Sequence, residues 1–352
     1  MKELFLVTAA AGIVLCAPSA AQDPAPHIYR GDFDARVRDA VDRGLTWLAS
    51  RQQPNGAWIN RVGYKLYDDY FGEENESVDV TAVSCMALVS AGSVPGRGRY
   101  GRNVALGLQW LLSKVRDEDG YITHAGSRMY SHAFATLFLA EIYGMTRQAE
   151  IKPKLKRAVD LIVNSQNREG GWRYQPIPVD ADLSVTVSTL QALRAARNVG
   201  IAVPLDTIHR ATRYVARCAT RRGFSYQSVN EYGMNDTRTS FALTACGVVS
   251  LFSAGLYDTR EVREAIRVLP QHRHTLIPGR LHYYYGHYYA AQAMYLAGAD
   301  EWARYYPGVK EEILRMQLRD GHWEDDVGRT YATAMACVVL QMPCEYLPIF
   351  QK

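Results

Sequence analysis

The chain has 352 residues, of which 48% are hydrophobic and 22% are charged. Its 40 basic and 36 acidic residues give a formal net charge of +4, and both signs are scattered along the sequence without a basic stripe. This pattern argues against nucleic acid as a partner, and a chain of this length can build its core without disulfide bonds.

The first residues have the pattern of a secretory signal peptide. Lys2 precedes an apolar run, and small residues follow it up to Ala21. We expect cleavage after Ala21, which would remove residues 1–21 and export the mature protein to the periplasm or the extracellular space. The apolar run is too short to remain as a membrane span, and no later segment predicts a transmembrane anchor. Cys16 leaves a lipid-anchored alternative open, although Leu15 stands where lipoprotein signals have a small residue.

A short leader, residues 22–34, precedes a single predicted helical domain over residues 35–352. In that domain apolar side chains recur every three or four residues, which is the period of an α-helix with one buried face. The alternation typical of β-strands is absent, so we expect no sheet. The pattern predicts six pairs of helices, each an outer amphipathic helix and a more apolar inner helix: 35–51 and 77–91, 103–115 and 130–143, 152–166 and 182–199, 205–219 and 236–254, 261–269 and 282–296, 309–318 and 330–342.

The inner helices are dominated by Ala, Leu, Val, Met and Cys, so they need cover on most sides. An open stack of helical hairpins would need polar repeats at its two ends. The last inner helix, residues 330–342, is instead among the most apolar. We therefore predict an all-α fold in which the six hairpins close into an (α/α)6 toroid.

A recurrent segment follows several of the outer helices. Gln52–Trp58, Gln166–Trp172 and Gln317–Trp323 share the pattern Gln-x-x-x-Gly-x-Trp, and we call them the Gln…Trp segments. Weaker copies end in Tyr121 and Phe224, and the five aromatic residues are 63, 51, 52 and 99 residues apart. The glycine permits a tight turn, the aromatic ring packs against a helix end, and the glutamine amide can satisfy free carbonyl groups. We interpret these segments as structural.

Six α-hairpins with Gln…Trp segments resemble the terpenoid cyclase and protein prenyltransferase superfamily, which includes squalene–hopene cyclases and prenyltransferase β subunits. The resemblance covers nearly the whole mature chain, and it extends to an exported bacterial branch with this toroid and no assigned reaction. It implies a central cavity and an apolar or isoprenoid-like ligand. The fold alone says little about activity.

Two functional motifs of that superfamily are incomplete in this chain. Residues 180–183, Asp-Ala-Asp-Leu, resemble the Asp-x-Asp-Asp acid of squalene–hopene cyclases, in which the middle aspartate, here Asp182, protonates the alkene or epoxide. Leu183 replaces the last aspartate. In the zinc-binding branch, residues 236–238 would need a cysteine where arginine stands, and residues 331–333 a histidine where alanine stands. We therefore expect no zinc, and no other cofactor.

Polar residues in the first turns of the inner helices are predicted to surround the mouth of the cavity. Asp182 is the catalytic candidate, and residues 281–289, rich in tyrosine and histidine, can hold a cation or an apolar ligand by their ring faces. Structural alternatives stay open, because Asp79, Asp182 and Asp236 also suit helix N-caps, and the aromatic residues also suit a filled ring. The ligand-binding candidates are Tyr130, His132, Thr186, Asp236, Arg238, Tyr284, Tyr285, His287, Tyr288 and Tyr331.

Three functions remain open on the sequence. The first is an exported toroid that binds an apolar or isoprenoid-like molecule, with or without turnover. The second is a secreted carbohydrate-active (α/α)6 enzyme, which would need two carboxylates across its cleft. The third is a non-catalytic scaffold whose surface binds a partner protein that the sequence does not identify.

Overall fold

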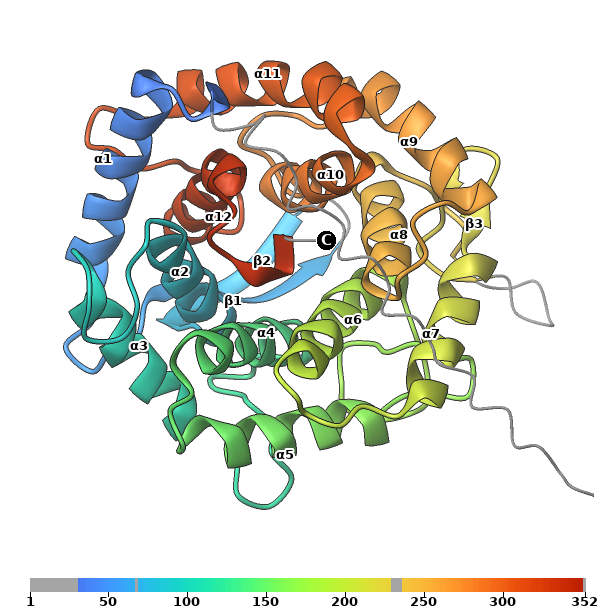
Figure 1. The fold of residues 1–352 in the computed structure, drawn as a ribbon, viewed down its shortest axis with the longest axis horizontal. Coiled ribbons are helices and arrows are strands. Elements are labelled where there is room, and N and C mark those ends of the chain that lie inside the picture. The colour runs from blue at the N-terminus through green and yellow to red at the C-terminus, as the bar shows by residue number, and fades with distance from the viewer. Residues whose placement is uncertain (1–30, 67–68, 229–235, 351–352) are drawn as a thin grey trace, which may run out of the picture.

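The computed structural model describes residues 31–66, 69–228 and 236–350, so the predicted signal peptide and most of the leader lie outside the described part. Twelve α-helices form two concentric layers within the described residues (Figure 1). The outer helices are α1 (Ala35–Arg51), α3 (Gly101–Ser113), α5 (Ile151–Asn164), α7 (Leu205–Arg217), α9 (Arg260–His272) and α11 (Ala299–Met316). The inner helices are α2 (Val78–Ser90), α4 (Met129–Thr146), α6 (Leu183–Asn198), α8 (Phe241–Ser253), α10 (Tyr283–Ala297) and α12 (Arg329–Gln341).

The inner helices form a closed ring. Each inner helix packs against the next one, and α12 packs against both α10 and α2, so the last hairpin meets the first. The outer helices present one apolar face to this ring, and the inner helices are buried on nearly all sides. The predicted (α/α)6 toroid is therefore confirmed. No helix within the described residues is both long and apolar enough to cross a membrane.

The Gln…Trp segments fasten each hairpin to its neighbours. The indole Nε1 of Trp172 donates to the carbonyl oxygen of Ile162 in its own outer helix at 2.7 Å. The Trp172 amide donates to Thr186 Oγ1 in the next inner helix at 3.2 Å, and the Gln166 side-chain amide reaches Thr207 O in the next outer helix at 2.9 Å. The Trp58 and Trp323 segments repeat this pattern. The segments therefore lie on the face of the ring where the inner helices begin.

Glycine is required within these segments because two backbones meet there. Gly170 has a φ of 102°, and a Cβ atom on it would lie 2.2 Å from the carbonyl oxygen of Arg210 in α7. Gly56 has a φ of 99° and meets Leu106 in α3 in the same way. A side chain at either position would push the next outer helix away from the ring.

The expectation of no β-structure is wrong. Strands β1 (Ile59–Leu66) and β2 (Asp69–Glu76) form an antiparallel hairpin between α1 and α2, and β3 (Ala219–Thr220) pairs with β4 (Gly223–Phe224). Both faces of the β1–β2 hairpin are largely exposed, so its sequence lacks the alternation that marks a half-buried strand. Contacts with the helical ring, and not a buried face of its own, hold the β1–β2 hairpin in place.

The two ends of the ring are covered by different parts of the chain. The β1–β2 hairpin lies across the end where the inner helices begin, where Asn60 Nδ2 donates to Val327 O at 3.1 Å and Lys65 Nζ contacts His282 Nε2 at 2.9 Å (Figure 1). At the other end the C-terminal segment folds over the centre, with Ile349 and Phe350 buried against the inner helices. The ring is closed at both ends in this structure.

Two helix boundaries also differ from the sequence-based expectation. Helix α8 begins at Phe241 rather than Asp236, because the Ser240 side chain caps it by accepting from the Leu243 amide. Helix α11 begins at Ala299 rather than Val309 and continues through Pro307. A proline inside a helix is normally a stop signal, which explains why the first half of α11 was not expected.

Candidate functional site

Tyrosine side chains from α10 cross the centre of the ring. The Tyr285 hydroxyl donates to Ser184 O of α6 at 3.0 Å, and its ring meets Tyr130 of α4 edge-on with centroids 6.3 Å apart. One turn deeper, the ring of Tyr288 meets Phe134 of α4 at 5.9 Å. Because α4 and α10 lie on opposite sides of the ring, these contacts fill its centre, which is the filled ring that the sequence left open as an alternative to a deep cavity.

Polar side chains lie deeper in the centre of the ring than these tyrosines. Gln191 of α6 donates from its side-chain amide to Gln292 Oε1 of α10 at 2.5 Å. The Gln191 carbonyl oxygen and the Tyr289 hydroxyl are buried and have no hydrogen-bond partner in the described structure. Buried polar groups without partners are costly, so the centre of the ring is not optimised as a purely structural core.

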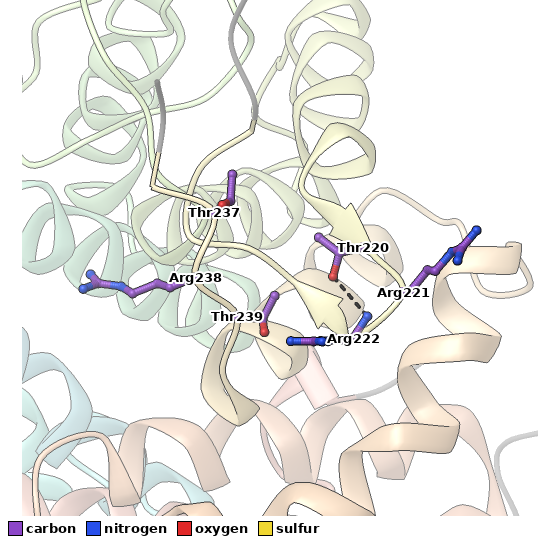
Figure 2. A pocket seen from close by; sticks show the side chains of 6 residues that line it. All are labelled: Thr220, Arg221, Arg222, Thr237, Arg238 and Thr239. Carbon is purple, nitrogen blue, oxygen red and sulfur yellow. Dashed lines mark hydrogen bonds between the residues drawn. The ribbon is translucent and has the colours of Figure 1, made fainter. Parts of the chain in front are cut away.

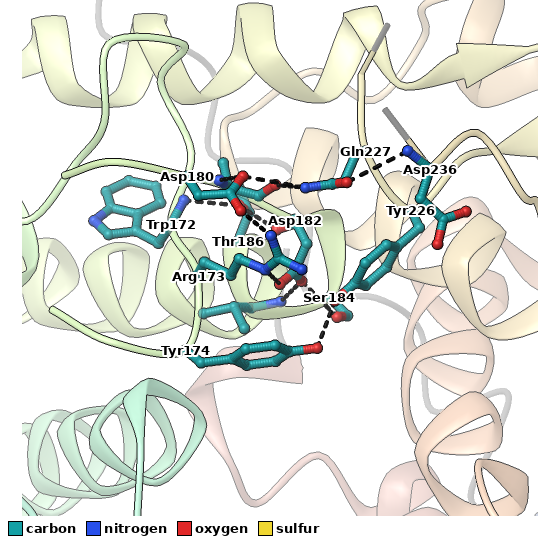
Figure 3. Close-up of polar contacts among 12 residues, drawn as sticks. Trp172, Arg173, Tyr174, Asp180, Asp182, Ser184, Thr186, Tyr226, Gln227 and Asp236 are labelled. Atoms are coloured by element: carbon teal, nitrogen blue, oxygen red, sulfur yellow. Dashed lines mark hydrogen bonds and ion pairs between the residues drawn. The ribbon is translucent and has the colours of Figure 1, made fainter. Parts of the chain in front are cut away.

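Asp182 stands at the rim of this aromatic centre, as the N-cap of α6. Its Oδ1 accepts from the Val185 amide at 2.9 Å and from Ser184 Oγ at 2.6 Å (Figure 3). Its Oδ2 is buried and accepts no hydrogen bond of normal geometry, and the nearest cation, Arg173 Nε, is 3.8 Å away. Burial raises the pKa of Asp182, and the hydroxyls, the Val185 amide and Arg173 only partly oppose this rise.

A polar network holds the loops around Asp182. Arg173 forms an ion pair with Asp180, and Gln227 Nε2 donates to Asp180 Oδ1 at 3.2 Å. The hydroxyls of Tyr174 and Tyr226 are 2.5 Å apart beside Ser184 (Figure 3). These residues follow the segments that end in Trp172 and Phe224. Those segments therefore position the network, although their own side chains are not part of it.

Asp325 is a second buried carboxyl that the sequence did not single out. It lies between the last Gln…Trp segment and α12, where its Oδ1 accepts from the Val327 amide at 2.6 Å. Its Oδ2 is buried without a partner, and burial raises the pKa of Asp325 to about 7. Asp79, by contrast, is not an N-cap, because Ser77 caps α2 and donates its hydroxyl to Asp79 at 2.5 Å.

Three predicted ligand-binding residues make structural contacts, although the buried Nε2 of His287 has no hydrogen-bond partner in the described structure. His132 accepts from the Ile122 amide at Nδ1 and lies 3.1 Å from Ala158 O at Nε2, and burial lowers its pKa to about 4. His287 Nδ1 meets the Tyr305 hydroxyl of α11 at 2.7 Å, so it points away from the centre. Thr186 accepts from the Trp172 amide. These side chains hold the two layers together rather than line the centre.

The remaining candidates are dispersed. Asp236 and Arg238 form an ion pair at 3.2 Å in the loop before α8, and the Arg238 guanidinium lies over the Tyr226 ring at 4.9 Å. Tyr284 is buried and packs edge-on against Tyr283. The Tyr331 amide donates to Asn60 Oδ1 at 3.3 Å, beneath the β1–β2 hairpin. Of the ten ligand-binding candidates, Tyr130, Tyr285 and Tyr288 meet at the ring centre.

Two surface pockets lie away from this centre. One, of about 440 Å³, is lined by Thr220, Arg221, Arg222, Thr237, Arg238 and Thr239. Figure 2 shows that Arg221 and Arg238 point to opposite sides of it, so its cations do not converge on one point. The described residues contain no group of three His, Cys, Asp or Glu side chains placed to hold a metal ion.

No protein-family model matches the chain. A squalene–hopene cyclase of Bradyrhizobium diazoefficiens is 24% identical over 179 residues, which are 46% of this chain and 26% of that enzyme. A lanosterol synthase of Aspergillus fumigatus is 25% identical over 162 residues, 42% of this chain and 18% of that enzyme. The chain thus spans about a quarter or less of the length of the curated relatives it matches.

Solved structures share the fold over most of both chains. A type II terpene cyclase from Scytonema, in complex with geranylgeranyl dihydroxybenzoate, aligns with a TM-score of 0.60 at 11% identity and covers 91% of this chain and 99% of its own. A cellobiose 2-epimerase from Spirochaeta thermophila aligns with a TM-score of 0.65 at 13% identity, covering 90% and 97%. The chain is therefore a terpenoid-cyclase-like (α/α)6 toroid, a fold that serves more than one chemistry.

Proposed function

We propose that this protein binds an apolar or isoprenoid-like ligand among the tyrosines at the centre of its ring, with Asp182 as the acid that protonates it. The observation that carries the proposal is the buried Oδ2 of Asp182, which accepts no hydrogen bond in the described structure and lies beside an aromatic lining. Burial raises the pKa of Asp182, and the protonated form that this shift stabilises is the form needed to protonate an uncharged substrate. The likeness to squalene–hopene cyclases supports the same choice.

The proposed chemistry needs no cofactor. The proton of Asp182 passes to one carbon of an alkene, the π electrons form the new C–H bond, and the neighbouring carbon becomes a carbocation. Faces of tyrosine rings stabilise such a cation, and Tyr130 and Tyr285 present theirs at the ring centre. Ser184 and Arg173 hold Asp182 and offset the carboxylate charge that the transfer leaves behind. The product cation then loses a proton to the Asp182 carboxylate, which restores the acid and completes the reaction.

Ligand entry requires movement at the covered end. The β1–β2 hairpin closes the face on which Asp182 lies, and the side chains of opposite helices are in contact. The structure therefore represents a closed state in this proposal, and the hairpin excludes water from the acid during the reaction.

Two other functions have an observation in their favour. The filled centre favours a scaffold that binds a partner protein through its surface. The fold likeness to an epimerase and the two buried carboxyls, Asp182 and Asp325, favour a carbohydrate-active enzyme. The aromatic surroundings of Asp182 give the isoprenoid proposal the advantage over both.

Native mass spectrometry tests the binding step. The wild-type protein, incubated with farnesol, geranylgeraniol and squalene, is expected to retain at least one of them, and Tyr288→Ala to retain less because the aromatic contact is lost. Tyr257→Ala, at an exposed tyrosine outside the ring, is the matched control. Retention of cellobiose instead supports the carbohydrate alternative, and retention of none supports the scaffold.

We also propose that the protein is exported, because its first residues form a signal sequence. N-terminal sequencing of the protein recovered from a secreting host should begin at Gln22. An intact Met1 in the cytosolic fraction would refute export.

A further inference from the structure

Arg128 lies unpaired at the mouth of the ring. It immediately precedes α4 and is half-buried, and its guanidinium lies 5.7 Å from the ring centroid of Tyr64 in β1 and 5.7 Å from that of Tyr174. Among the residues that the structure describes, no carboxylate is within ion-pair distance of Arg128, and its side chain donates no hydrogen bond. A cation placed between two rings in this way is positioned but not neutralised.

The stacking leaves the donors of Arg128 available. A guanidinium is planar and carries five N–H groups in that plane. Tyr64 and Tyr174 offer the guanidinium only their ring faces, so neither takes up its N–H donors. Edge-on approach is the geometry in which a carboxylate or a phosphate accepts two parallel hydrogen bonds from arginine.

The neighbouring charges leave a positive excess at this position. Arg173 is paired with Asp180, and Arg238 is paired with Asp236. The cation beside Asp182 is Arg173, whose Nε lies 3.8 Å from Oδ2, and not Arg128. The first turn of α4, an 18-residue helix, adds a partial positive charge from its free amide groups.

Arg128 is also adjacent to the proposed acid site. Tyr174, which contacts the guanidinium, lies 6.3 Å from the Tyr130 ring and shares a hydrogen bond with the Tyr226 hydroxyl beside Asp182. If the apolar part of a ligand lies among the central tyrosines, its other end points toward the mouth of the ring and reaches Arg128.

We propose that Arg128 binds an anionic end of the ligand, a carboxylate or phosphate group, so that the ligand is an anionic amphiphile rather than a pure hydrocarbon. This inference rests on the proposed function and names the class of its ligand. The unpartnered Tyr289 hydroxyl and Gln191 carbonyl deeper in the ring agree with a ligand that carries oxygen as well as carbon.

Calorimetric titration with farnesoic acid and farnesol tests it, because the two probes share one isoprenoid chain and differ in the charge of the end group. Wild-type protein should bind the acid about tenfold more tightly than the alcohol, as expected for one charge-assisted bidentate contact. Arg128→Gln should abolish this preference. Arg147→Gln, at the opposite end of α4 with its guanidinium 5.3 Å from the Tyr143 ring, should keep it.

Equal binding of both probes, or a preference that survives in Arg128→Gln, overturns the anion site and leaves the proposed function standing. If neither probe binds, the proposed function fails, and anilinonaphthalene sulfonate, an anionic aromatic amphiphile, decides the anion site separately. Weaker sulfonate binding in Arg128→Gln than in Arg147→Gln supports the site, and equal binding refutes it. Arg128→Lys keeps the positive charge but loses the paired N–H donors of the guanidinium. Its preference for the acid over the alcohol should lie between that of the wild type and that of Arg128→Gln.

Discussion

The side-chain amide of Gln317 donates to the carbonyl oxygen of Ala40 at 2.7 Å, although 277 residues separate them. This hydrogen bond joins the last Gln…Trp segment to the first outer helix, as Gln52 joins α1 to α3 and Gln166 joins α5 to α7. The segment that links consecutive repeats thus also closes the ring. Arg36 and Glu311 add an exposed ion pair at 2.8 Å across the same seam.

Removal of this link should destabilise the whole ring. Gln317→Ala loses the hydrogen bonds to Ala40 and to Gly321 and leaves buried acceptors, so the free energy of unfolding should fall by about 1–3 kcal/mol. Gln53→Ala, at a neighbour of Gln52 with only a weak contact to Arg51 O at 3.4 Å, should change it by less than about 0.5 kcal/mol. Urea denaturation followed by circular dichroism measures both, and equal effects would contradict the role in closure.

Two tyrosine-to-phenylalanine variants should change the free energy of unfolding in different directions. The Tyr289 hydroxyl is buried without a partner, so Tyr289→Phe should leave stability unchanged or raise it by up to about 1 kcal/mol. The Tyr130 hydroxyl donates to Ser184 Oγ at 2.5 Å, so Tyr130→Phe should cost about 1 kcal/mol. Thermal unfolding of the two variants compares them directly. A loss of stability in Tyr289→Phe would show that its hydroxyl has a structural partner.

Stability should fall between about pH 4.5 and pH 8 because of Glu141. Its Oε2 accepts from the Ile349 amide of the C-terminal segment at 3.2 Å, and burial raises the pKa of Glu141 from 4.5 to about 8. Below pH 4.5 the folded and unfolded chains both hold the proton. As pH rises toward 8 only the unfolded chain releases it, so its contribution to stability is lost, by up to roughly 4 kcal/mol.

Glu141→Gln removes this titration while keeping the shape of the side chain. The free energy of unfolding of the variant, measured in urea at pH 5 and pH 8, should therefore fall less with pH than that of the wild type. Parallel pH profiles would show that Glu141 is already ionised in the folded chain.

The β1–β2 hairpin should open more readily when its anchor is removed. Asn60 donates to Val327 O and accepts from the Tyr331 amide, whereas its cross-strand partner Asn75 bonds only the adjacent Glu76 amide. Asn60→Ala should therefore lower the hydrogen-exchange protection of residues 59–76 and speed ligand association, and Asn75→Ala should do neither. Unchanged exchange in Asn60→Ala would mean that other contacts, such as that of Lys65 with His282, hold the hairpin closed.

The toroid could be predicted because its signals are local and repeated. Gln166, Gly170 and Trp172 stand at fixed spacings, and each makes the contacts that its chemistry favours. The hairpin could not, because Asn60 holds it to Val327 and to Tyr331 of the distant α12. No periodicity within the strands records that contact.

The site was predictable in part. Asp182 was singled out by its position in a motif, and it is both an N-cap and the acid candidate. In the tyrosine-rich run, Tyr285, Tyr289 and Gln292 recur every three or four residues on the face toward the centre, while His287 lies on the other face. Helical spacing alone would have assigned His287 to a different face from these three residues. Arg128 and Asp325 could not be found in this way, because tertiary packing decides which of many charges lacks a partner.

Deuterium transfer from solvent tests the central claim most directly. An isoprenoid ligand retained by the protein is incubated with it in D₂O, and the mass of the recovered product is measured for wild type, Asp182→Asn and Asp206→Asn, the last an exposed aspartate of α7. We predict that wild type and Asp206→Asn incorporate one deuterium at carbon and that Asp182→Asn does not. Incorporation that is unchanged in Asp182→Asn, or absent in wild type, would contradict the role of Asp182 as the acid.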